Sequence, residues 1–360
     1  MLHTRVFVFG GKNMNLYHEN GYANIPEILK QGQPFNFVVG GRGTGKTFGA
    51  LDYVARSGIR FCLMRRTQSQ LETIARSETN PFKSVVAAMN VEWTAEPVVA
   101  GKSVFAYYKT TRDEEGKPVY GDLMGYAVAL STIANLRGFD MADVELLIYD
   151  EFIPESHERK MKFECDAFLN AYETINRNRE IQGRKPLQVL CLANSNDFAN
   201  PLFIGLGLVG TLERMLRENR ESYINPQRGI GIFLLTDSPI STRKARTAVY
   251  KLTTGSSFYD MAVSNAFAGQ DDPDIRSVTF RDYSPLVAVG ELCIYKHKAE
   301  SSYYISSHYS GSVTRYSGTG IDMGRFAATH KGIFLAAMSG RCLYESHLCK
   351  ALFLRYLGFD

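Results

Sequence analysis

The chain has 360 residues, of which 45% are hydrophobic and 22% charged, a balance typical of a globular protein with room for two domains. Its formal net charge of +4 permits a polyanionic partner without requiring one. No run reaches the ~18 apolar residues that a membrane-spanning helix needs, and the amino terminus lacks a signal-peptide pattern, so we expect no membrane partner. The six cysteines form no Cys-x-x-Cys pair, which favours reduced thiols over disulfides or a zinc site.

The first predicted elements are a short helix over residues 26–30 and a β-strand over residues 35–39. This strand leads directly into a glycine-rich segment with the spacing of a phosphate-binding loop. The loop and the start of the helix after it consist of Gly40, Gly41, Arg42, Gly43, Thr44, Gly45, Lys46 and Thr47.

Each residue type in this loop suits a nucleoside triphosphate. Glycine allows the backbone N–H groups to surround a phosphate at positions where a Cβ would obstruct them. Lys46 supplies a positive charge for the β- and γ-phosphates, and the Thr47 hydroxyl is a ligand for Mg²⁺. The helix that follows adds the positive end of its dipole. We therefore expect ATP and Mg²⁺ as the bound groups.

The next segments alternate between strands and helices. A buried strand over residues 59–64 ends in Arg65 and Arg66, which either contact phosphate or nucleic acid, or pair with acidic groups at the surface. Residues 70–89 read as a helix broken at residues 80–81. Residues 98–108 and 128–133 read as strands, and residues 110–120 between them as the tip of a hairpin.

A second apolar run, residues 144–149, has strand length and ends in Asp150 and Glu151. An acidic residue at the end of a buried strand beside a phosphate loop can hold Mg²⁺. Glu151 is then positioned to deprotonate the water that attacks the γ-phosphate. A glutamate directly after the magnesium aspartate is typical of hydrolytic, motor-like enzymes with a phosphate loop.

Two further segments carry polar side chains of interest. Residues 166–179 are predicted to form a helix that ends in an arginine-rich sequence; an arginine exposed there either balances the helix dipole or reaches the γ-phosphate of a neighbouring subunit. Residues 187–193 form a buried strand that ends in Asn194-Ser195-Asn196, which is either a turn or a sensor of the γ-phosphate.

These motifs, taken in order over residues 30–210, resemble the double-stranded DNA packaging ATPases of small tailed phages of the podophage type, relatives of the terminase large subunits. The resemblance rests on residues 35–47, 63–66, 147–152, 176–180, 190–196 and 200–201. It implies a RecA-like, additional-strand, catalytic-glutamate ATPase domain. It also implies Lys46, Glu151 and Arg177 as catalytic residues, with Arg177 acting on a neighbouring subunit and Arg179 as its alternative. Thr47 and Asp150 match the metal pair, and Asn194 begins the coupling motif.

The same resemblance implies the setting in which the protein works. Its partners would be double-stranded DNA, the phage portal or connector, and a packaging RNA. The subunits would form a homo-oligomeric ring, a pentamer by family resemblance, at the capsid portal vertex in the host cytoplasm.

The remainder of the chain suggests a second domain. We expect an ATPase domain over residues 1–240, a linker or small linker domain over 241–272, and a C-terminal domain over 273–360. Basic residues of the linker region (Arg243, Lys244 and Arg246) are either solvated or follow DNA phosphates. The last block reads as strands over residues 278–280, 287–295, 302–307 and 332–338 and a helix over 344–356.

The larger relatives carry an RNase H-like nuclease in this position. Its metal ions need several converging carboxylates. The acids here, with Asp322, Asp282 and Glu291 as candidates, are sparse, so we expect a nuclease-like shell without nuclease activity.

The expected function is ATP hydrolysis coupled to the translocation of duplex DNA into a preformed capsid. Two alternatives remain open at this point. One is a helicase or recombinase-type translocase on single strands, which organised stacking aromatics in a basic groove would support. The other is a nucleotide-gated docking protein that binds ATP with little turnover.

Overall fold

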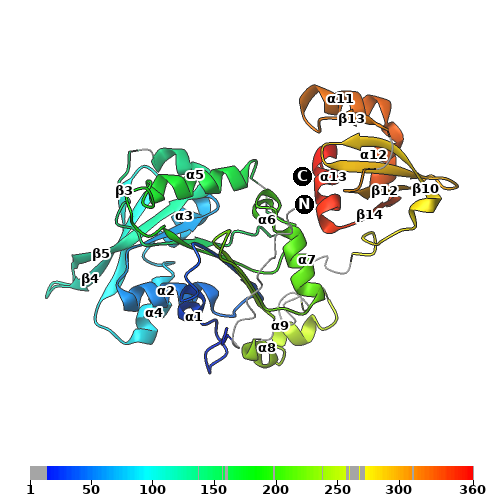
Figure 1. The fold of residues 1–360 in the computed structure, drawn as a ribbon. Helices are drawn as coiled ribbons and strands as arrows, with labels where there is room; N and C mark the ends of the chain where they lie inside the picture. Colours follow the sequence, from blue (N-terminus) through cyan, green and yellow to red (C-terminus); the bar gives the residue numbers. More distant parts are fainter. Residues whose placement is uncertain are drawn as a thin grey trace. The chain divides into compact units, whose positions relative to one another are not determined.

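The computed structural model describes residues 14–136, 138–155, 157–158, 161–197, 199–236, 238–256, 259, 267, 272–309 and 312–359. The chain divides into two compact units (Figure 1). Unit 1 comprises Met1–Leu206 and Leu212–Ala268, and unit 2 comprises Gly207–Thr211 and Gly269–Asp360. Unit 1 contains the phosphate-loop sequence.

In its described part, unit 1 is built on a nine-stranded sheet in the order β3-β4-β5-β2-β6-β7-β1-β9-β8. The central strands from β5 to β9 run parallel, while β3 and β4 at one edge and β8 at the other pair antiparallel. The strands are β1 (Phe35–Gly40), β2 (Phe61–Arg65), β3 (Thr94–Gly101), β4 (Val104–Arg112), β5 (Pro118–Ala129), β6 (Leu146–Asp150), β7 (Gln188–Ala193), β8 (Ser222–Asn225) and β9 (Ile230–Leu235).

Helices cover both faces of this sheet. In Figure 1, α1, α2 and α4 lie on one face and α5 lies on the other. The helices of unit 1, with the 3₁₀ segment η1, are α1 (Ile25–Leu29), α2 (Lys46–Ser57), α3 (Gln68–Ile74), α4 (Phe82–Met89), η1 (Leu130–Leu136), α5 (Glu164–Asn176), α6 (Pro201–Gly205), α8 (Pro239–Lys244) and α9 (Ala248–Leu252); α7 (Val209–Arg217) crosses the division between the units.

Strand β1 shows how the sequence distributes side chains to the two faces. Successive strand residues point to opposite faces. The Phe35 ring packs against Phe168 and Tyr172 of α5, with centroids 6.4 and 4.8 Å apart, whereas Val38 belongs to the core that includes Ala50 of α2. Both faces of β1 are therefore buried, as expected for a parallel strand between two helical layers.

The order of the strands brings the chemistry-bearing segments together. β7 lies between β1, which leads into the phosphate loop, and β6, which ends in Asp150. Because β1, β2, β6 and β7 are parallel, their carboxyl ends lie at one edge of the sheet. The segments that begin after Gly40, Met64, Tyr149 and Ala193 therefore meet there.

Most predicted elements of unit 1 are confirmed, including the helix break near residues 80–81 and the β4–β5 hairpin. Two expectations were wrong. The run 98–108 is divided between β3 and β4, with Ser103 at the turn in a left-handed conformation (φ 62°). Residues 130–133, expected in a strand, lie in η1. Alternating apolar residues fit both strands of a hairpin, so the pattern did not reveal the reversal.

In its described part, unit 2 contains a five-stranded sheet in the order β13-β10-β11-β12-β14. β10, β11 and β12 pair antiparallel, and β13 and β14 add in parallel at the two edges. The elements are η2 (Phe280–Asp282), β10 (Tyr283–Val289), β11 (Leu292–His297), β12 (Tyr303–Ser306), β13 (Thr314–Tyr316), α11 (Gly320–Thr329), α12 (Lys331–Met338), β14 (Cys342–Tyr344) and α13 (His347–Leu357).

Three strand predictions in unit 2 were wrong. Residues 332–338 form helix α12. Its sequence, Gly-Ile-Phe-Leu-Ala-Ala-Met, is apolar without period-two alternation, and only the packing of Ile333 and Ala336 into the core distinguishes the two assignments. The run 287–295 is two strands joined by a turn at Gly290 (φ 55°). Residues 278–280 precede the sheet, and Phe280 lies in η2.

The described residues include no helix whose length and apolar character would let it cross a membrane.

Candidate functional site

The glycine-rich segment forms a tight loop between β1 and α2. Gly43 and Gly45 have φ angles of 68° and 79°, a left-handed conformation that L side chains rarely adopt. A Cβ on Gly45 would lie 2.6 Å from Cδ1 of Tyr22. Backbone conformation therefore favours glycine at both positions, and space also requires it at Gly45.

Lys46 is buried at the start of α2, with its ammonium group turned into the loop. Its Nζ donates to Gly40 O at 2.8 Å, to Gly41 O at 2.9 Å and to Asn194 Oδ1 at 3.2 Å. Burial lowers the pKa of Lys46 to about 7, although Asp150 opposes this shift. A buried ammonium with a depressed pKa is stabilised by an anion, so this environment fits a phosphate.

Thr47 and Asp150 meet directly, although they are far apart in the chain. Thr47 Oγ1 donates to Asp150 Oδ1 at 3.0 Å. A hydroxyl and a carboxylate in contact beside a phosphate loop form a donor set that fits Mg²⁺, which prefers oxygen ligands and retains several waters. The predicted metal pair is therefore brought together.

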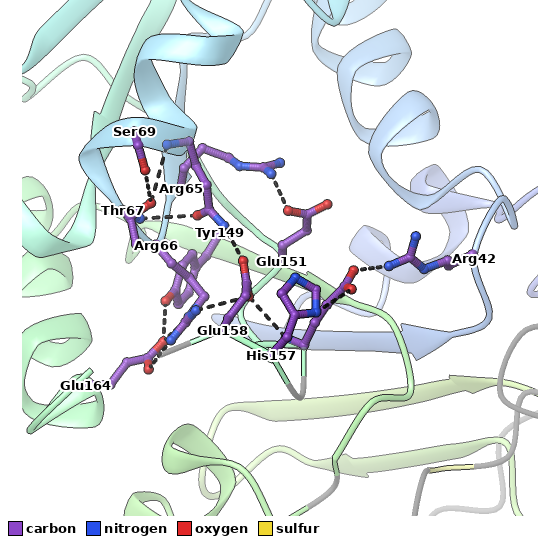
Figure 2. A network of polar contacts seen from close by, with 12 residues as sticks. Arg42, Arg65, Arg66, Thr67, Ser69, Tyr149, Glu151, His157, Glu158 and Glu164 are labelled. Atoms are coloured by element: carbon purple, nitrogen blue, oxygen red, sulfur yellow. Dashed lines mark hydrogen bonds and ion pairs between the residues drawn. The ribbon is translucent and has the colours of Figure 1, made fainter. Parts of the chain in front are cut away.

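Arg65 pairs with both acidic residues at the end of β6. Its Nη1 donates to Asp150 Oδ2 at 2.7 Å, and its Nη2 forms an ion pair with Glu151 (Figure 2). Of the two interpretations of Arg65, the one with acidic partners is correct for this structure. These partners belong to the site itself and not to an unrelated surface.

Glu151 has a left-handed backbone conformation, with φ 58°. Its side chain is about half exposed, at 49%. Burial raises the pKa of Glu151 above its usual value, and Arg65 opposes the rise. A carboxylate with a raised pKa is a better proton acceptor from water, which is a property expected of a general base.

Behind β6 lies a buried polar network that the sequence did not predict (Figure 2). Arg66 donates to both carboxylate oxygens of Glu164, at 2.8 and 3.1 Å, and Tyr149 Oη donates to Glu164 Oε1 at 2.8 Å. Arg66 also pairs with Glu158 at 3.3 Å. Arg66 therefore pairs with acids, as one of its two interpretations proposed, but inside the protein. The only signal in the sequence was an arginine next to Arg65.

Arg42, in the phosphate loop, forms an ion pair with Glu155 of the loop after β6 (Figure 2). Asn194 contacts Lys46, as described above, and Asn196 N donates back to Asn194 O at 2.9 Å. The polar segment after β7 is therefore a tight turn that also contacts the loop lysine. Both interpretations of this segment are compatible with its structure.

Arg177 does not lie at this site. It caps the carboxyl end of α5, where Nη1 donates to Asp140 Oδ1 at 2.9 Å and Nη2 to Phe139 O at 2.7 Å. Residues 139–140 precede β6, so Arg177 lies at the amino edge of the sheet, opposite the phosphate loop. Arg179 is buried and donates to Ala142 O at 3.0 Å. Of the two arginines, only Arg177 has an exposed side chain, at 41%.

In unit 2, the candidate nuclease acids are distributed over separate elements. Asp322 lies in the first turn of α11, accepts from Ser317 N at 3.2 Å and pairs with Arg325 at 3.7 Å. Asp282 lies in η2, and Glu291 in the turn between β10 and β11. Within the described ranges, no three His, Cys, Asp or Glu side chains form a group that could hold a metal ion.

The fold and the site define an α/β protein whose parallel sheet carries a phosphate-binding loop at its carboxyl edge, with an acidic strand end in contact with that loop. The model of the podovirus DNA encapsidation protein (Gp16) family matches residues 18–278, which is more than half of the chain. The chain belongs to this family. The family that the motifs indicated is thus confirmed.

Individual relatives agree with this assignment. The chain is 25% identical over 254 residues to the DNA packaging protein of Bacillus phage phi29, a match that covers 69% of this chain and 66% of the relative. It is 24% identical to the DNA packaging protein of Bacillus phage B103, over 92% of this chain and 94% of the relative. The chain thus spans about 66% of the phi29 relative's length.

The fold is also similar to that in a solved structure of the Phi-28 gp11 DNA packaging motor. The TM-score is 0.63 at 18% identity, and the match covers 95% of this chain and 99% of the other. At this identity the similarity establishes a shared fold.

Proposed function

We propose that this protein is an ATP-driven motor that translocates double-stranded viral DNA into a preformed capsid. The observation that carries the proposal is the contact between Thr47 and Asp150, 3.0 Å long, beside the buried Lys46. In a member of a DNA encapsidation family, a site with these groups fits hydrolysis of a nucleoside triphosphate as the energy source for packaging. The names of the relatives, DNA packaging proteins, support the same function.

We further propose the finer fold assignment. β7 between β1 and β6 supports an additional-strand, catalytic-glutamate ATPase of the RecA-like group over residues 1–240. Residues 241–272 would be the linker, and residues 273–360 an RNase H-like shell without nuclease activity. The five-stranded mixed sheet of unit 2 and the separation of its acids support this last assignment.

The phosphate loop and the end of β6 supply the groups that would bind the nucleotide. The backbone of residues 40–47 would surround the phosphates, with Lys46 as their countercharge and Asn194 beside it. Thr47 and Asp150 would hold Mg²⁺. When bound, Mg²⁺ would neutralise the charge that develops on the phosphate oxygens.

Glu151 would act as the general base that accepts a proton from the attacking water. Its exposure leaves it accessible to water, and its raised pKa suits the task. In the structure its carboxylate pairs with Arg65. This contact positions the Glu151 carboxylate beside Asp150, which pairs with the same arginine.

We propose a homo-oligomeric ring, with five subunits by analogy with the family. In such a ring Arg177 would stabilise the charge on the γ-phosphoryl group of a neighbouring subunit. Its exposure at the edge of the sheet opposite the loop supports action between subunits. Residues 194–196 would couple the loss of phosphate contacts to movement of DNA-gripping loops. The partners would be duplex DNA, the portal and a packaging RNA, at the portal vertex in the host cytoplasm.

The test is the ATPase rate of the full chain with and without linear duplex DNA, alongside the Glu151→Gln variant. We expect duplex DNA to stimulate wild-type turnover. Glu151→Gln should abolish turnover, by roughly a hundredfold or more, and leave ATP binding intact. A clear preference for single-stranded over duplex DNA would favour the translocase alternative. Slow turnover that Glu151→Gln leaves unchanged would favour the docking alternative.

A further inference from the structure

Helix α8, in the region predicted to be a linker, packs against the segment that supports the phosphate loop. Ser238, just before the helix, donates from Oγ to Gly21 O at 2.8 Å. A Cβ on Gly21 would lie 2.9 Å from Ile240 N, so the two backbones are in close contact. The same segment is bonded to the phosphate loop, because Ala23 N donates to Thr44 O at 2.9 Å. The position of α8 relative to the loop is therefore fixed by packing within unit 1.

Lys244, the last residue of α8, reaches the phosphate loop. A Cβ built on Gly43 would lie 2.9 Å from both Cε and Nζ of Lys244. The ammonium group is shielded from solvent and has no hydrogen-bond partner in the described part of the chain. The ammonium group lies over the ring of Tyr250, 5.5 Å from its centroid. Lys244 thus presents an unsatisfied cation to the middle of the loop.

This placement is unfavourable in the absence of an anion. A shielded ammonium group without a hydrogen-bond partner lowers the stability of the folded protein. Two further cations, Arg42 and Lys46, lie close to Lys244. Burial lowers the pKa of Lys244, and the charge of Arg42 lowers it further. The charge of Lys244 contributes in turn to the lowered pKa of Lys46. Arg42 forms an ion pair with Glu155, and Lys46 donates hydrogen bonds to loop carbonyls. Lys244 Nζ has no hydrogen bond to a described residue. An anion bound at Gly43 would compensate the charge of Lys244.

Two other roles fit the geometry less well. A lysine at the end of a helix often bonds to the last carbonyls, but Lys244 Nζ donates to no described group. A contact to DNA phosphates, one interpretation of the basic residues in this segment, fits less well because the ammonium lies against Gly43, in the middle of the phosphate loop.

We propose that Lys244 is a second lysine of the nucleotide site, supplied by α8 of the same subunit, which binds the polyphosphate across Gly43. This inference rests on the proposed ATP site and extends it to a helix outside the phosphate-loop motif. The packing of α8 holds Lys244 beside the loop without a ligand, and bound polyphosphate would add one contact to this packing.

The test compares Lys244→Met with Lys251→Met in the full chain, each combined with Glu151→Gln to prevent turnover. Lys251 is an exposed lysine on the next helix, α9, so it provides a matched control. The probes are MgATP and magnesium tripolyphosphate, which lacks base and sugar, and the readouts are affinity by calorimetry and thermal unfolding.

We expect Lys244→Met to weaken the binding of both probes about tenfold, as for loss of one charge-assisted hydrogen bond, and Lys251→Met to have no effect. Without a ligand, Lys244→Met should unfold at the same temperature as its parent or at a higher one, because an unpaired buried charge has been removed. Its stabilisation by MgATP should be smaller. Lys244→Arg, which keeps the charge, should retain most of the affinity.

Unchanged affinity for both probes in Lys244→Met would overturn the proposal, as would loss of duplex DNA binding with normal MgATP binding. If Lys244→Met and Lys244→Gln both lower the unfolding temperature of the ligand-free protein, the lysine is structural and the proposal is also wrong. Failure of the parent chain to bind MgATP at all would instead refute the proposed function.

Discussion

At the scale of single residues, Arg66 determines how the acidic end of β6 is supported. Its side chain is only 1% exposed, and that of Glu164 is fully buried. Such a pair requires several hydrogen bonds to compensate for desolvation. Glu164 has them, from two Arg66 nitrogens and from Tyr149 Oη. Tyr149 directly precedes Asp150, so the network fixes the backbone from which the metal and general-base carboxylates extend.

This network predicts unequal costs for removing its members. Glu164→Gln leaves Arg66 buried with only Glu158 as an acidic partner, and we expect a loss of about 3 kcal/mol in the free energy of unfolding. Tyr149→Phe removes one hydrogen bond and keeps the ion pair, and we expect a loss of about 1 kcal/mol. Urea unfolding followed by the fluorescence of Trp93, the one tryptophan and a residue of unit 1, measures both. Equal losses would contradict this account.

At the scale of elements, an ion pair attaches α13 to the first segment of unit 2. Lys350 of α13 donates to Asp272 at 2.5 Å and to Asp274 at 3.1 Å, in the segment that enters the unit. Burial raises the pKa of Asp272. Hydrogen bonds from Lys350 and the backbone, together with the charge of His347, lower it by more, so the pKa of Asp272 is below its usual value. The pair therefore stabilises the folded unit while Asp272 is ionised.

The sign of the pH dependence follows from this lowered pKa. The stabilisation is fully present above the pKa of an unfolded aspartate, about 3.9, and is lost as the pH falls through the lower folded value. Lys350→Met should therefore destabilise unit 2 by about 1 kcal/mol at pH 7 and by much less at a pH below the folded pKa of Asp272. Far-UV circular dichroism in urea reports this change, and Trp93 fluorescence serves as the unit 1 control. A constant difference at every pH would show that the ion pair is not responsible.

At the scale of the whole molecule, the position of Arg177 decides whether it can act within one subunit. Arg177 lies at the edge of the sheet opposite Asp150 and therefore cannot serve its own site. Arg179, the alternative, donates to backbone carbonyls at 3.0 Å in the interior, so it has a structural role. If Arg177 is catalytic, the site is complete only between subunits, and turnover depends on ring formation.

A mixing experiment tests this dependence. In the DNA-stimulated ring, Arg177→Ala should reduce turnover by roughly a thousandfold, the effect typical of an arginine supplied to a phosphoryl group. Arg177→Ala mixed with Glu151→Gln should recover part of the activity, because some interfaces then combine an intact Glu151 with an intact Arg177. Arg179→Ala should lower the unfolding temperature in the unassembled chain. No recovery in the mixture would refute the role of Arg177 between subunits.

The sequence by itself determined the elements that depend on local patterns. The phosphate loop, Lys46, Thr47 and the acidic end of β6 could be predicted because spacing and residue type express the chemistry directly. Long apolar runs identified the buried strands, and turn residues marked most of their ends. Where an apolar run suited two structures, as at residues 332–338, local pattern did not decide and tertiary packing did.

Only the tertiary structure decided which distant residues meet. The pairing of Arg66 with Glu164, 98 positions apart, and the approach of Lys244 to Gly43 follow from strand order and helix packing, which leave no periodic signal in the sequence. For the same reason the sequence alone left two interpretations of Arg65. The pairing of β2 with β6 in the sheet places Arg65 beside the acidic residues at the end of β6. A charged side chain acquires its role from the charge that faces it, and the fold alone selects that partner.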